Sequence, residues 1–181
     1  GAPVETPWVG QCRALVYGAL GGQAGAGAAA DILTGRLCPC GKLSQTWAQA
    51  HDDTPAKANF GGEGRNVEYR EGLYVGYRYY QTAGVKPAFP FGYGLSYTTF
   101  EYSGLKADET GATLTVTNTG SAAGAEIVQL YVAKQDAKIF RPEQELKGFA
   151  KVSLAPGESK TVTIVLDDKA FRYWNVKTNA W

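Results

Sequence analysis

The chain has 181 residues, a length that suits one domain or two small ones. Hydrophobic residues make up 44% of it, the usual share for a globular chain with a core. Its 18 basic and 17 acidic residues give a net charge of +1, and no apolar run approaches the roughly 18 residues of a membrane helix. We therefore expect neither nucleic acid nor a membrane as a partner.

The first third of the chain is glycine-rich, and its pattern predicts two helices. The first would be short, over residues 12–20, and the second would run over residues 23–33 and end at Thr34 and Gly35, because glycine is a favoured C-terminal cap. Gly25 and Gly27 each cost a helix about 1 kcal/mol relative to alanine. We expect such glycines where another backbone approaches closely, which predicts that this helix packs on a sheet.

The middle of the chain changes from a loop to an aromatic block. Pro, Gly, Asn and Asp residues mark residues 48–66 as a long loop. Eight of the eleven tyrosines then lie between Tyr69 and Tyr102. Aromatic rings with polar tips suit a seam between domains, which is our first interpretation, and they also suit a sugar-binding wall.

The last third has the period of two that is typical of β-strands. Leu114 and Val116 alternate with threonines, and similar runs predict strands over residues 113–117, 127–132, 146–154 and 161–166. Short strands separated by turns predict an antiparallel β-sandwich.

One glycine-rich loop carries a candidate general acid. Glu63 lies within residues 61–65 (GGEGR), and Glu68 and Glu71 follow it. Neighbouring carboxylates raise one another's pKa and so favour acid catalysis. A solvated loop glutamate is the simpler interpretation, and the residues alone favour it.

The other polar clusters give weaker signals. Residues 21–27 could cradle a phosphate, but they form neither a G-x-G-x-x-G motif nor a P-loop. Ser44 has no nucleophile elbow around it, His51 is the single histidine, and residues 167–169 (DDK) are interpreted as a charge cluster at a strand end. Cys38 and Cys40 flank a proline, and without a second cysteine pair we interpret them as free thiols rather than a zinc site; their role stays open. We expect no metal and no cofactor.

Several stretches of the chain form a recognisable set: residues 7–8 (PW), 22–25 (GQAG), 30–35 (ADILTG), 41–47 (GKLSQTW), 68–80 (EYREGLYVGYRYY) and 89–100 (FPFGYGLSYTTF). Together they resemble the end of the α/β-sandwich domain and the connector of glycoside hydrolase family 3, and the β-rich remainder resembles that family's fibronectin type III-like domain. The resemblance implies a mixed α+β fold, the tail of an α/β sandwich followed by an antiparallel fibronectin type III-like β-sandwich. It places the end of the α/β-sandwich domain and a loop at residues 1–66, a tyrosine-rich connector at 67–104 and the β-sandwich at 105–181, without that domain's final strand.

The resemblance also implies a retaining β-glucosidase or a related β-xylosidase. In that family an Asp nucleophile lies on a (β/α)8 barrel and a Glu acid/base lies on a loop of the α/β sandwich, and a retaining mechanism needs the two carboxyl groups about 5–5.5 Å apart. Neither residue maps onto this chain, so we expect no catalytic residue here and treat Glu63, which follows the GKLS segment, as a decoy. Cys38 and Cys40 depart from the family, which usually has an Asn-Pro-Ser-Gly turn there.

We therefore interpret the chain as a non-catalytic piece of a larger hydrolase, inactive alone, that braces the catalytic domains. Its partners would be those domains, on the same or a second chain, the β-glucoside substrate of the intact enzyme, and optionally a second copy of the chain. Residues 3–8 resemble members in which the barrel follows the fibronectin-like domain, but the order stays open. The sugar and the linkage also stay open. The compartment, bacterial cytoplasm or secreted, stays open as well, and residues 1–5 do not resemble a signal peptide. The alternative is a stand-alone carbohydrate- or protein-binding module that uses Tyr93 and Tyr97.

Overall fold

The structure is a computed structural model that describes residues 2–181, and the chain divides into two compact units. Unit 1 contains the residues up to Thr34, Lys42–Gly94 and Asp136–Glu143. Unit 2 contains Gly35–Gly41, Leu95–Gln135 and Gln144–Trp181. Each unit thus includes a short segment from the other's stretch of sequence. The domain boundaries at residues 66 and 104 stay predictions.

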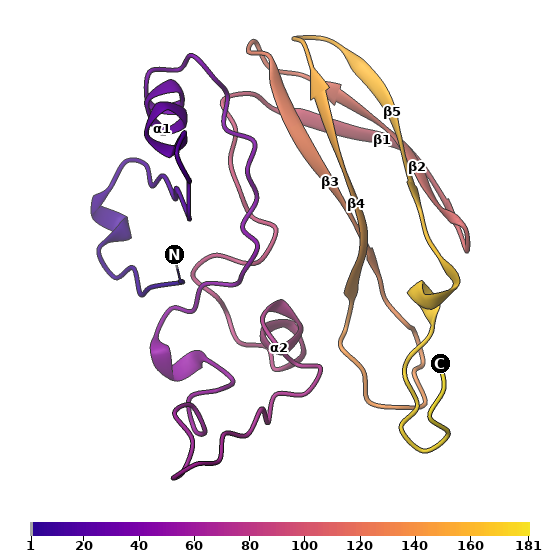
Figure 1. The fold of residues 1–181 in the computed structure, drawn as a ribbon. Helices are drawn as coiled ribbons and strands as arrows, with labels where there is room; N and C mark the ends of the chain where they lie inside the picture. Colours follow the sequence, from indigo (N-terminus) through magenta and orange to yellow (C-terminus); the bar gives the residue numbers. More distant parts are fainter. Residues whose placement is uncertain (1) are drawn as a thin grey trace. The chain divides into compact units, whose positions relative to one another are not determined.

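Unit 2 contains five antiparallel strands in two sheets (Figure 1). One sheet has the order β1-β2-β5, and the other pairs β3 with β4. The bounds of the strands are β1 Phe100–Asp108, β2 Gly111–Asn118, β3 Gly124–Val132, β4 Glu145–Leu154 and β5 Ser159–Val165. This arrangement confirms the predicted antiparallel β-rich module, and four of its strands lie where the alternating pattern placed them.

The core of unit 2 is formed by apolar side chains from both sheets. Val116 is fully buried, and Leu114, Val128, Leu154, Val162 and Ile164 form one cluster with it. Leu114 and Val116 are separated by Thr115, which lies on the opposite face of β2. The alternation seen in the sequence therefore corresponds to one buried face and one partly exposed face. Burying a side chain of this kind contributes about 1.5–3 kcal/mol, which makes the cluster the main stabilising feature of the unit.

Strand β1 was not predicted. Every residue of β1 after Phe100 is exposed, and its pairing with β2 shifts between Ser103 and Lys106. An edge strand that is exposed to solvent on both faces needs no alternation of apolar and polar residues, and a shift in register interrupts any regular pattern along it. Its sequence therefore lacks the signal that identified the other four strands.

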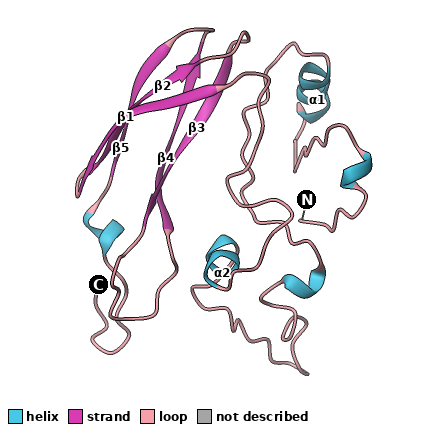
Figure 2. Cartoon of the chain, turned by 180° about the vertical axis from the view of Figure 1, so that it is seen from behind, coloured by secondary structure: helices cyan, strands magenta, loops and turns pink. Residues whose placement is uncertain are grey.

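Unit 1 contains two α-helices and two 3-10 turns, joined by long loops (Figure 2). The bounds are η1 Val9–Gln11, α1 Gly25–Leu33, η2 His51–Asp53 and α2 Tyr77–Thr82, and a further turn, η3 Asp168–Phe171, follows β5 in unit 2. Helix α1 ends as predicted, because Gly35 has a φ of +74° directly after the C-cap residue Thr34. None of these helices has the length and apolar character needed to cross a bilayer, within residues 2–181.

One prediction about the first third is wrong. Residues 12–20 form no helix; Gly18 lies within the segment, and Ala19 has a φ of +47° that a helix does not allow. The packing of helix α1 on a sheet stays a prediction, since within residues 2–181 none of its residues is buried and a Cβ at Gly25 or Gly27 would meet nothing within 4 Å. Within the described chain, the small face of α1 is left uncovered.

The interior of unit 1 is aromatic. Trp47 is 4% exposed; its ring meets Tyr17 edge-on at 5.0 Å and Phe89 at 6.1 Å between centroids. The backbone fixes this position, because Trp47 N–H donates to the Phe89 carbonyl at 2.8 Å and Ala88 N–H donates to the Trp47 carbonyl at 2.8 Å. Segments some 40 residues apart in sequence are thereby joined.

Candidate functional site

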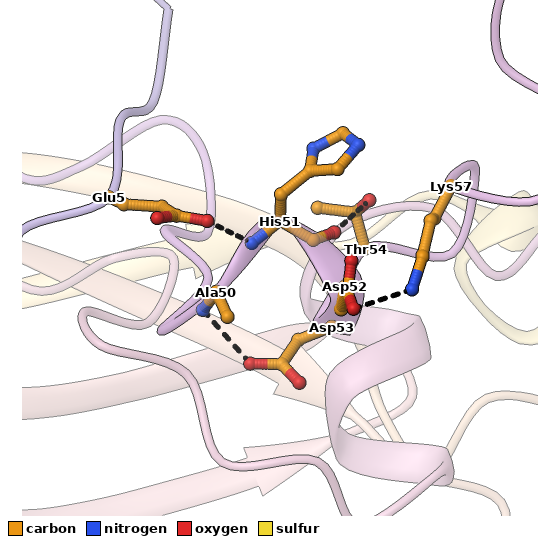
Figure 3. A network of polar contacts seen from close by, with 7 residues as sticks. All are labelled: Glu5, Ala50, His51, Asp52, Asp53, Thr54 and Lys57. Atoms are coloured by element: carbon orange, nitrogen blue, oxygen red, sulfur yellow. Dashed lines mark hydrogen bonds and ion pairs between the residues drawn. The ribbon is translucent and has the colours of Figure 1, made fainter.

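A cluster of polar contacts in unit 1 surrounds the single histidine and is drawn in Figure 3. The backbone N–H of His51 donates to Glu5 Oε1 at 2.5 Å, which ties the start of the chain to η2. Asp53 Oδ2 accepts from Ala50 N–H at 3.0 Å, and Thr54 Oγ1 donates to the His51 carbonyl at 2.8 Å. These contacts are those of a capped turn, since side-chain oxygens satisfy the backbone groups at its two ends.

The side chains of this cluster form a local turn and a surface ion pair. The imidazole of His51 points away from the carboxylates in Figure 3, so no His–Asp relay forms. Asp52 pairs with Lys57 at 2.6 Å, and this hydrogen bond and charge lower the pKa of the exposed Asp52 carboxyl. A general acid needs the opposite shift, because it must hold its proton near neutral pH.

The glycine loop places Glu63 in a tight turn. Glu63 and Asn66 exchange backbone hydrogen bonds of 2.9 and 3.0 Å, and Glu63 is exposed. Gly62 has a φ of +69°, and a Cβ there would collide with the Asn66 carbonyl, so the glycine is needed by the turn itself. Glu68 is bound to Arg70 at 2.6 Å, on the surface. The expectation that Glu63 is not an acid/base residue stays a prediction that this geometry favours.

The remaining candidates occupy local structural roles. Residues 21–24 precede α1, whose N-cap residue is Ala24, and no side chain caps it. Asp167 caps η3 by accepting from Ala170 N–H at 3.1 Å, and Asp168 pairs with Arg172 at 3.1 Å. No group of three or more potential metal ligands occurs in the described part of the chain.

Cys38 has a defined role in packing that the sequence did not reveal. All three cysteines are free of disulfide bonds. Cys38 Sγ lies 3.1 Å from Ser96 Oγ and accepts the Tyr97 N–H at 3.3 Å, so residues 35–41 are held against the start of β1 within unit 2. A Cβ on Gly124 would come within 2.8 Å of Thr98 Cγ2 and within 3.3 Å of the same sulfur, which explains the glycine at the beginning of β3.

Unit 2 also has a shallow hollow of about 470 Å³ beside this segment. Its lining includes Leu37, Cys38, Gly124, Leu154, Glu158 and Lys160. Lys160 is already engaged, donating to the Ser153 carbonyl at 2.8 Å and pairing with Glu158 at 3.0 Å. Glu158 is the single carboxylate among the described lining residues, so the hollow lacks the carboxylate pair that glycoside hydrolysis requires.

The most perturbed titratable group in unit 2 is Tyr102. The residue is 49% exposed, and its hydroxyl donates to Glu126 Oε1 at 3.2 Å. Partial burial, followed by the charge of Glu126, raises the pKa of Tyr102 above its ordinary value. Glu126 is 8% exposed and does not line the hollow, so the pair links β1 to β3 within unit 2.

The aromatic block divides between the two units. Within unit 1, Tyr77 stacks on Phe91 at 4.9 Å and Tyr93 lies 5.8 Å from Phe89. Most of these rings thus pack on one another, as a seam or a core requires. Tyr93 and Tyr97, the proposed sugar wall, are 40% and 52% exposed but belong to different units.

Comparison with known proteins matches both parts of the chain. Residues 1–97 match the family model of the glycosyl hydrolase family 3 C-terminal domain, and residues 126–181 match that of the fibronectin type III-like domain. The chain is 49% identical to thermostable beta-glucosidase B of Acetivibrio thermocellus, over 100% of the chain and 25% of that protein. It is 48% identical to an exo-alpha-(1->6)-L-arabinopyranosidase of Bifidobacterium breve, over 97% of the chain and 24% of that protein.

Solved structures agree with the fold. A GH3 beta-glucosidase of Bifidobacterium adolescentis superposes with a TM-score of 0.91 and 46% identity, covering 97% of this chain and 27% of that one. A beta-glucosidase of Kluyveromyces marxianus gives 0.90 and 46%, covering 98% and 22%. The mixed fold predicted from the resemblance is confirmed. The chain spans about a quarter of the length of the relatives it matches.

Proposed function

This chain belongs to glycosyl hydrolase family 3, and from that membership we propose that it is a non-catalytic part of a retaining β-glucosidase-type enzyme. The intact enzyme would hydrolyse terminal β-D-glucosyl, or β-xylosyl, residues. The part described here would brace the catalytic domains and supply neither of the two carboxylates. A second copy of the chain stays an additional predicted partner.

The observation that carries this proposal is the apolar surface of unit 1. Leu20 is 89% exposed, Leu33 at the end of α1 is 71% exposed, and Leu15 and Val16 are 41% and 51% exposed. Large apolar side chains exposed in this number within residues 15–33 indicate a surface that another part of a protein covers. The chain superposes on a longer GH3 beta-glucosidase with a TM-score of 0.91, which supports the backbone path of the segments that carry these side chains. We infer that the rest of a family 3 polypeptide covers it.

The sugar is not determined by this part of the enzyme. A beta-glucosidase and an exo-alpha-(1->6)-L-arabinopyranosidase match the chain at 49% and 48% identity over nearly its whole length. Proteins named for different sugars are thus equally similar to it. Specificity would then reside in residues elsewhere in the enzyme, which is what a bracing role predicts.

The experiment compares one substitution in two settings. Leu33→Lys, in the isolated chain, should leave the melting temperature nearly unchanged, because the side chain is exposed and a cation suits the last turn of a helix. In the full-length polypeptide the same substitution should lower the melting temperature by several degrees, because it buries an unpaired charge. An equal effect in both settings would refute the proposed docking of this surface.

Hydrolysis is tested separately. The purified chain should release no nitrophenol from p-nitrophenyl β-D-glucoside or β-D-xyloside, whereas the full-length polypeptide should hydrolyse at least one of them. Turnover by the isolated chain that persists through repeated purification would contradict the non-catalytic role. Full-length protein without glycosidase activity, but with saturable sugar binding lost in Tyr93→Ala, would support the binding-module alternative.

A further inference from the structure

Two short segments are exchanged between the units. Gly35–Gly41 follows α1 in sequence, yet it belongs to unit 2; Asp136–Glu143 lies between β3 and β4 in sequence, yet it belongs to unit 1. In sequence, residues 35–41 are preceded and followed by residues of unit 1, and residues 136–143 are preceded and followed by residues of unit 2. This is more than a linker between two domains, because the path of the chain passes from one unit into the other and back twice.

The first segment is held in unit 2 by Cys38. Its sulfur contacts Ser96 Oγ at 3.1 Å and accepts the Tyr97 N–H at 3.3 Å. Within unit 1, the chain resumes at Lys42, whose Nζ donates to the Gly94 carbonyl at 2.8 Å. The chain is therefore held in unit 1 at Lys42, whereas the preceding residues 35–41 pack in unit 2.

The second segment is held in unit 1 by an aromatic stack. Phe140 lies on Tyr74 with 5.0 Å between ring centroids and 29° between planes. The other face of Phe140 is open, since the side chain is 80% exposed. The Tyr74 ring is half-buried and its hydroxyl lies inside the unit, so the ring beneath Phe140 is anchored in unit 1.

We propose that these two segments couple the units, so that opening of one promotes opening of the other. When unit 1 opens, residues 136–143 lose their anchor and the connection between Val132 and Glu145 becomes a flexible loop that unit 2 must close by itself. Closing a flexible loop of about 12 residues lowers the equilibrium constant for folding of unit 2 by at most roughly 40-fold. When unit 2 opens, residues 35–41 impose a smaller penalty of the same kind on unit 1. The coupling goes beyond the bracing role, because it holds for the chain by itself.

Amide hydrogen exchange of the isolated chain tests this directly. The perturbation is Phe140→Ala, which removes the stack in unit 1, and the readout is the exchange of the amides of β2 and β5 in unit 2. These strands are remote in sequence from the substitution and pair with each other through their whole length. If opening is coupled, their exchange should accelerate roughly twofold to tenfold, the range expected for losing one aromatic pair.

Two further variants distinguish coupling from general destabilisation. Phe60→Ala removes an aromatic side chain of unit 1 that is 83% exposed, and it should leave β2 and β5 exchange within a factor of two of the parent. Phe140→Tyr keeps a ring for stacking and should restore the parent rate. The proposal is overturned if Phe140→Ala leaves β2 and β5 unchanged, or if Phe60→Ala accelerates them equally. Should Phe140→Ala not fold, Phe140→Leu is used with the same criteria.

Discussion

Asn118, at the end of β2, is the polar residue on which unit 2 depends most, and its replacement should be severely destabilising. The side chain is fully buried. Its Oδ1 accepts from Thr98 Oγ1 at 2.6 Å and Gly120 N–H at 3.1 Å, and its Nδ2 donates to the carbonyls of Ala122 at 2.8 Å and Leu154 at 3.1 Å. One amide thus satisfies four groups from three segments: Thr98, the turn after β2 and the end of β4.

The expected magnitude for Asn118→Ala follows from these four contacts. Each hydrogen bond contributes about 1 kcal/mol net, and each buried group left unpaired costs about 1–3 kcal/mol. Because water will reach some of the groups in the space left by the amide, we expect a loss of about 3–5 kcal/mol in the free energy of unfolding. A loss of this size is a large part of the stability of a domain.

Urea unfolding followed by far-UV circular dichroism measures this loss. Asn175→Ala, in the same unit, is the matched control, because the Asn175 side chain is partly exposed and accepts one hydrogen bond, from Lys177 N–H at 3.0 Å. The control should cost no more than about 1 kcal/mol. A loss below about 1 kcal/mol for Asn118→Ala, or equal losses for the two variants, would refute the reasoning.

Two other substitutions in unit 2 have defined outcomes. Gly111→Ala should lower the free energy of unfolding in urea by about 1–3 kcal/mol, because the φ of Gly111 is +152° and a Cβ there would collide with the backbone of β5. Gly41→Ala is the control and should be nearly neutral, because the space around a Cβ at Gly41 is open. Equal losses for the two variants would contradict this prediction. The Ala155 N–H at 2.7 Å and then Lys160 lower the pKa of Glu158 in the folded state. Its contribution is therefore present above the unfolded pKa of about 4.3 and is lost as the pH falls through the lower folded value. Glu158→Gln should flatten the fall of the urea midpoint below about pH 4, and an unchanged slope would count against the contacts described.

The sequence predicted the elements whose side chains have one buried face. Leu114 and Val116 are buried on one face of β2, and their alternation with threonines was visible without a structure. Strand β1 lacked any such signal because it is exposed on both faces. The predicted helix over residues 12–20 did not form; in the structure, Leu15 and Val16 are exposed and belong to no helix.

The tertiary roles of single polar residues could not be predicted in the same way. Cys38 was noted for its spacing from Cys40, but its partners Ser96 and Tyr97 are more than 50 residues away in sequence. The four contacts of Asn118 likewise depend on where β1 begins and β4 ends. Such roles are set by the register of strands and the closure of loops, which local patterns do not contain.

The central claim is that this chain is part of a larger glycosidase, and the mass of the native polypeptide tests it most directly. An antibody raised against the 19.3 kDa chain should detect, in extracts of the source cells, a polypeptide of about four times that mass. β-Glucosidase or β-xylosidase activity should co-purify with this polypeptide. A native product of about 19.3 kDa, with no larger polypeptide bound to it and no associated glycosidase activity, would contradict the account.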